Sequence, residues 1–148
     1  MSNKDILIFA EKLGNIGEYA QSQLKPILEI HEKDVLEEQK ERIHVKGEDV
    51  FNKKFGDYSP FSIEKRKEEG KFYDFIILKD EGDFEESEFI KSSESGYEFG
   101  ATDPKTAKLK IDYDPMFGAD EAEKGRLSKI VHFSIMKKVR KYLASWKK

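Results

Sequence analysis

The chain has 148 residues, of which 37% are hydrophobic and 39% charged, with a formal net charge of -3. This length fits one domain that can bury most of the apolar surface its unfolded form exposes, and an aromatic content of 12% argues against disorder. The absence of cysteine excludes disulfides and thiolate sites, and the short apolar run at residues 6–10 predicts neither a signal peptide nor a membrane span, so we expect a cytoplasmic protein.

The first part of the chain is expected to hold two helices. Apolar residues recur at three- and four-residue steps over residues 6–24, which predicts an amphipathic helix capped by Asn3 or Asp5. Pro26 fits the first turn of a second helix, and Gly47 is its expected end. The apolar face of the second helix is expected to include Ile27, Ile30, Asp34 or Val35, and Gln39.

A short helix and an apolar segment are predicted next. Residues 48–57 indicate a loop or a short strand between two glycines. Ser59-Pro60 is a helix start and Gly70 a helix stop. The apolar run at residues 75–78 predicts a buried strand or an extended segment, and residues 80–84 predict a turn with room for one helical turn.

A β-hairpin is the clearest prediction in the chain. Residues 87–92 and 97–101 alternate between apolar and polar side chains, and Ser95-Gly96 lies between them as the expected turn. The alternation predicts that one face of the hairpin is buried.

Helices are expected again at the C-terminal end. Thr102-Asp103-Pro104 starts a short helix that extends to Ile111, and Pro115 follows as a break. The last helix is predicted to begin near Asp120 and to run towards Trp146. Its apolar stripe consists of Leu127, Val131, Ile135, Val139, Tyr142 and Trp146, and we expect Ile130 and Phe133 to widen it.

This order of elements predicts an α+β fold with a small antiparallel sheet, flanked by N-terminal helices and a long C-terminal helix. We expect a single domain over residues 1–148. It divides into a helical region at 1–46, strands and a short helix at 47–101, and the C-terminal helices at 102–148.

The charges are distributed unevenly along the chain. Between residues 80 and 98 the acidic residues are Asp80, Glu81, Asp83, Glu85, Glu86, Glu88, Glu94 and Glu98, and Lys91 is the one basic residue. Residues 124–148 carry basic residues and no acidic one. One interpretation is two solvated surfaces. The other is a pair of complementary patches for head-to-tail contacts, with interface residues Asp83, Glu85, Glu86, Glu88, Lys137, Lys138, Arg140 and Lys141.

Enzyme chemistry is not favoured by any motif. Glu85 and Glu86 are adjacent and diverge on either a strand or a helix, and Asp83 with Glu85 lies in a segment dense in acid. A calcium loop counted from Asp112 has its glycine displaced by one position, and the histidines lack ligand spacing. Phosphate-loop and dinucleotide motifs are missing. We therefore predict no catalytic, cofactor or metal site.

The alternative function is that of a small nucleic-acid-binding or regulatory protein that uses its basic C-terminal helix. The last helix is basic, as phosphate binding requires, and its DNA-contacting residues would be Lys137, Lys141, Lys147 and Lys148. The same helix carries a full apolar stripe, which makes a solvated basic face the simpler interpretation.

One short pattern resembles a known family. Leu78, Glu81, Gly82, Phe84 and Ser87 follow the step Leu-x-x-Thr/Glu-Gly-x-Leu/Phe-x-x-Ser, within a region covering about residues 58–118. This region is similar to small virion proteins of tailed bacteriophages, in the minor tail-component or virion-morphogenesis group, although Glu81 stands where that group commonly has Thr. In physical terms Gly82 allows a sharp turn, Phe84 enters the core beside Leu78, and a generic turn into a hairpin would use the same residues.

The resemblance implies a structural role without enzyme activity. The expected function is a neck, head–tail connector or tail-completion subunit that forms a homo-oligomeric ring around the DNA channel of the virion, assembled in the host cytoplasm. The implied partners are further copies of the chain and portal, adaptor or tail-tube proteins, with passing contact to genomic DNA. Cofactors, membranes and small-molecule substrates are not expected.

Overall fold

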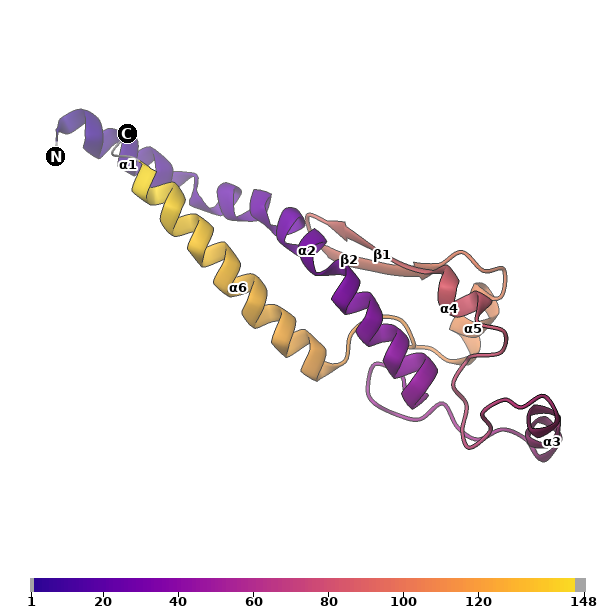
Figure 1. The fold of residues 1–148 in the computed structure, drawn as a ribbon. Coiled ribbons are helices and arrows are strands. Elements are labelled where there is room, and N and C mark those ends of the chain that lie inside the picture. The colour runs from indigo at the N-terminus through magenta and orange to yellow at the C-terminus, as the bar shows by residue number, and fades with distance from the viewer. Residues whose placement is uncertain (1, 146–148) are drawn as a thin grey trace.

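Two helical segments lie antiparallel and form a long arm (Figure 1). The computed structural model describes residues 2–145. α1 (Asn3–Gly14) and α2 (Ile16–Glu41) follow one another along one side, and α6 (Glu121–Ala144) returns along the other. The remaining elements are the π-helical turn η1 (Arg42–Lys46), α3 (Pro60–Glu68), α4 (Asp83–Ser87), β1 (Glu88–Ser93), β2 (Gly96–Ala101) and α5 (Thr106–Asp112). The predicted α+β fold is confirmed.

The N-terminal ends of α1 and α6 are each closed by a capping box. Ser2, rather than Asn3 or Asp5, is the N-cap of α1, and Asp5 completes a capping box with it. Asp120 caps α6 in the same way, with Glu123 as its partner, so the predicted start of this helix is confirmed.

The division between the first two helices lies at Asn15, and the predicted boundary at Pro26 is wrong. Helical hydrogen bonds continue across the division, because Asn15 N–H donates to Glu11 O at 3.1 Å and its carbonyl accepts from Tyr19 N–H at 3.0 Å. Pro26 lies inside α2. The carbonyl that loses its bond to Pro26 belongs to Ser22, and both residues are exposed, so water can satisfy it.

The hydrophobic core lies where the arm meets the rest of the chain. Ile43, Phe84 and Met116 are buried together, and Leu78 packs against them, as the sequence predicts for Phe84 and Leu78. α2 buries Ile27, Leu28, Val35 and Gln39. Ile30 was expected on this face but is 73% exposed, because Leu28 takes the inward position.

The hairpin lies beside α2 (Figure 1). Its register pairs Glu88 with Ala101 and Ser93 with Gly96, so the turn is Glu94-Ser95 rather than the predicted Ser95-Gly96. The hairpin face that meets α2 is only partly buried, since Glu88 is its one buried residue and the others are half-buried. On this face Ser92 donates to Glu32 (2.6 Å) and Tyr97 donates to the Leu28 carbonyl (2.5 Å).

Residues 75–78 form no regular strand, because the chain bends at Phe75 and again at Leu78, whose φ is 47°. Ile76 N–H donates to the Gly56 carbonyl at 2.9 Å, and the Ile77 side chain is buried. Gly47 ends η1 with a φ of 64°, and a Cβ at this position would overlap the Ile76 carbonyl oxygen. Only glycine fits the close passage of these two backbones.

Candidate functional site

The four acidic residues predicted to form one surface are divided by the structure. Asp83 and Glu86 are exposed on α4. Glu85 is half-buried, and its carboxylate forms an ion pair with Lys79 Nζ at 3.1 Å. Glu88 is only 5% exposed and faces inward, so its assignment to a surface patch is wrong.

Glu88 is the centre of a buried polar cluster. Its carboxylate accepts from Gln39 Nε2 at 2.9 Å and contacts His44 Nε2. His44 Nδ1 lies 3.2 Å from the Ile77 carbonyl and must donate to it, because a carbonyl only accepts. One proton therefore lies between His44 Nε2 and the carboxylate of Glu88. The cluster joins α2, η1 and the hairpin.

Arg42 extends these polar contacts to the start of α6. Its guanidinium donates to the carbonyls of Met116 (3.1 Å) and Gly118 (2.5 Å). Its Nε lies 3.8 Å from the carboxylate of Glu123 and makes no hydrogen bond within the described chain. Burial lowers the pKa of Arg42 and raises the pKa of Glu123, each opposed by the charge of the other. We interpret both clusters as structural.

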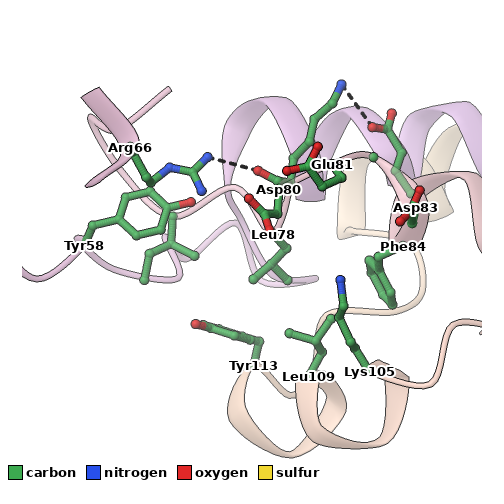
Figure 2. Close-up of a pocket in the computed structure, with 14 residues that line it drawn as sticks. Tyr58, Arg66, Leu78, Asp80, Glu81, Asp83, Phe84, Lys105, Leu109 and Tyr113 are labelled. Atoms are coloured by element: carbon green, nitrogen blue, oxygen red, sulfur yellow. Dashed lines mark hydrogen bonds and ion pairs between the residues drawn. The ribbon is translucent and has the colours of Figure 1, made fainter. Parts of the chain in front are cut away.

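A cavity of about 310 Å³ lies beside α4, around the segment that carries the family resemblance. Its apolar lining, called the floor below, includes Leu78, Phe84, Leu109 and Tyr113, and Ile76 and Tyr58 also line the cavity. Figure 2 shows Leu109, Tyr113 and Lys105 on one side of this pocket and Asp80, Glu81 and Asp83 on the other. The arrangement can receive an apolar group within a charged rim.

The charges on the pocket rim are mostly paired. Lys71 contacts the carboxylates of Glu69, Asp80 and Glu81, which raises the pKa of Lys71; its hydrogen bond to Asp80 lowers the pKa of that carboxyl. Arg66 lies over the Tyr58 ring at 4.5 Å. Asp83 has no ion pair among the residues that the structure describes. It is therefore the rim carboxylate available to an incoming cation.

A second candidate surface is the outer face of α6. Ile130, Phe133 and Met136 are exposed on it, Phe133 to 71%, so the prediction that Ile130 and Phe133 widen the core stripe is wrong. The inward face of α6 is already filled by Val131, Ile135, Val139 and Tyr142, which leaves no room in the arm for a second apolar row. We call Ile130, Phe133 and Met136 the outer row.

The basic residues of the prediction follow the outer row along α6. Lys137, Arg140 and Lys141 are exposed and Lys138 is half-buried. Lys129 lies one turn before Phe133 and Lys137 one turn after it. Trp146, Lys147 and Lys148 lie outside the described residues. The C-terminal half of α6 lies far from α4 in Figure 1, so the acidic and basic residues of one copy do not meet.

Sequence reasoning missed the pocket and the outer row. The pocket combines residues from four separate segments, of which the step from Leu78 to Ser87 was the one recognisable in sequence. The sequence did contain a signal for the outer row, because the last helix has apolar residues in addition to those of its complete apolar stripe.

No family model, curated protein or solved structure matches the chain. Among residues 2–145, no helix has both the length and the apolar character needed to span a membrane. The same residues contain no cluster of three or more His, Asp or Glu suited to hold a metal ion.

Proposed function

We propose that the chain is a structural assembly protein that acts by binding other protein subunits, including further copies of itself. The observation that carries this proposal is the outer row of α6. An apolar row exposed in the middle of a helix leaves surface that another protein can cover. The lysines and arginine around it favour an acidic partner surface, and α4 offers exposed carboxylates at Asp83 and Glu86.

The narrower proposal is a neck, connector or tail-completion subunit of a tailed phage, arranged as a ring around the DNA channel. Its support is the resemblance of residues 58–118. The elements of that pattern have coherent physical roles: Phe84 and Leu78 enter the core, and Ser87 Oγ accepts from Asp103 N–H at 3.1 Å where the hairpin closes. Portal, adaptor or tail-tube proteins would be its neighbours in the virion.

The alternative is a nucleic-acid-binding protein, which the exposed Lys137, Arg140 and Lys141 favour. Phe133 and Ile130 precede these charges on the exposed face of the same helix and suit a protein partner better than a phosphate backbone.

Sedimentation velocity over a range of protein and salt concentrations separates the two functions. Assembly predicts species larger than a monomer that grow with protein concentration. A chain that stays monomeric, and binds duplex DNA with an affinity that falls steeply with salt, would support the alternative and refute assembly. The narrower proposal requires the chain to be a component of purified phage particles, and its absence from them would refute that form alone.

A further inference from the structure

We propose that the pocket beside α4 receives Phe133 from α6 of a second copy. This contact rests on the proposed self-assembly and specifies its geometry: the outer row of one subunit docks on the pocket rim of the next.

The first support is the fit between an exposed aromatic side chain and an apolar cavity. The pocket holds about 310 Å³ above a floor formed by Leu78, Phe84, Leu109 and Tyr113. An apolar cavity on the order of 150 Å³ already accommodates a benzene ring. Phe133 is 71% exposed in the isolated chain, so most of its side chain is available to enter such a cavity.

The second support is charge. Phe133 is bracketed by Lys129 and Lys137, one turn away on either side. The pocket is lined by the carboxylates of Asp80, Glu81, Asp83 and Glu85 and by the cations Arg66, Lys79 and Lys105. Lys71 pairs with Asp80 and Glu81, and Lys79 pairs with Glu85, so Asp83 is the carboxylate of this lining that has no ion pair within residues 2–145. A helix docked through Phe133 brings Lys129 and Lys137 to this rim, where Asp83 can pair with one of them.

Two other arrangements fit less well. If two copies paired through their α6 outer faces, Lys129, Lys137 and Arg140 of both copies would be brought together, and like charges oppose that contact. Phe61 on α3 is 77% exposed, but Glu64 and Lys65 lie one turn beyond it with opposite charges, so it lacks the cationic flanks that the rim favours.

This contact is heterologous, because it joins two different surfaces. Each copy keeps a free pocket when its Phe133 is bound, and a free Phe133 when its pocket is filled. Such contacts build rings where the rotation closes and filaments where it does not.

The test uses cysteine cross-linking, which is clean because the natural chain has no cysteine. Glu86→Cys on α4 and Met136→Cys on α6 keep Asp83, Phe133 and both flanking lysines intact. The two variants are purified separately and mixed with a short bismaleimide. We expect a cross-linked heterodimer from the mixture and none from either variant alone. Ser22→Cys, exposed on α2, replaces Glu86→Cys in the matched control and should give no cross-link with Met136→Cys.

A second measurement compares Phe133→Ala with Phe61→Ala in sedimentation. Both side chains are exposed, so both variants should fold. We expect Phe133→Ala to weaken self-association by about tenfold to a hundredfold, the range for burying one large apolar side chain, and Phe61→Ala to leave it unchanged.

The outcomes separate the contact from the proposed function. Assembly without the 86–136 cross-link, with Phe133→Ala assembling like the natural chain, overturns the pocket contact and leaves self-assembly standing. A natural chain that remains monomeric at every concentration overturns both.

Discussion

Replacing Glu88 distinguishes a buried structural carboxylate from the surface residue that the charge pattern predicts. Glu88→Ala removes the acceptor of both His44 Nε2 and Gln39 Nε2, whose own side chains are almost fully buried. Each buried polar group left without a partner costs about 1–3 kcal/mol, and Glu88→Ala leaves two such groups. We therefore expect Glu88→Ala to lower the free energy of unfolding by about 2–6 kcal/mol.

Urea unfolding followed by circular dichroism measures this loss. Glu86→Ala is the matched control, since it removes the same side chain from an exposed position two residues away, and it should change stability by less than about 0.5 kcal/mol. Glu88→Gln should lie between the two, because an amide can accept from Gln39 and donate to the imidazole of His44.

The reasoning is refuted if Glu88→Ala and Glu86→Ala have equal stability within error. If that equality comes with impaired self-association of Glu88→Ala alone, Glu88 is an interface residue, as the sequence-based prediction has it.

Three further changes test other parts of the fold. Gly47→Ala should destabilise the chain by at least about 2 kcal/mol, because the left-handed backbone and the Ile76 carbonyl both reject a Cβ. In the control Gly125→Ala in α6, the added Cβ meets no atom within 4 Å, so this variant should be slightly more stable than the natural chain. Thermal unfolding of both variants measures the difference. Burial, with a smaller contribution from a nearby carboxylate, raises the pKa of Tyr97 to about 12, above its ordinary value near 10. Its contribution to stability is therefore complete below pH 10 and lost as pH rises from 10 towards 12, so urea midpoints over this window should fall more steeply for the natural chain than for Tyr97→Phe; parallel slopes would contradict the burial of the phenol. Tyr142→Ala removes the ring that stacks on Tyr19 and lies under Lys12 Nζ of α1, so it should speed hydrogen exchange of the α1 amides while leaving the hairpin amides unchanged; uniform acceleration would show that the arm does not open separately.

The elements that sequence reasoning predicted are those with local signals. Two alternating segments around a short turn are enough for the hairpin, and Asp120 followed by Glu123 marks the start of α6 through capping alone. Phe84 was placed in the core because the glycine before it turns the chain inward.

The errors arise where tertiary contacts decide. Pro26 is a strong helix-start signal, yet an exposed carbonyl one turn earlier lets the helix continue through it. Glu88 lies in a run of acids, and only the pairing with β2 and the position of α2 turn its side chain inward. The periodicity of α6 shows more apolar positions than one stripe needs. It does not show that the N-terminal helices cover only one face of α6, which is why Phe133 was assigned to the core.

The antiparallel arm determines how the molecule would respond to tension. The ends of the described chain, Ser2 and Ser145, lie at the same tip of the arm, where Lys12 contacts the Ser145 hydroxyl. A pull applied between them peels the helices apart turn by turn, starting with the stacked rings of Tyr19 and Tyr142, whose centroids lie 4.1 Å apart. A load applied between α6 and the hairpin instead strains the buried polar clusters all at once, so the same fold is mechanically weak along one direction and stiff along another.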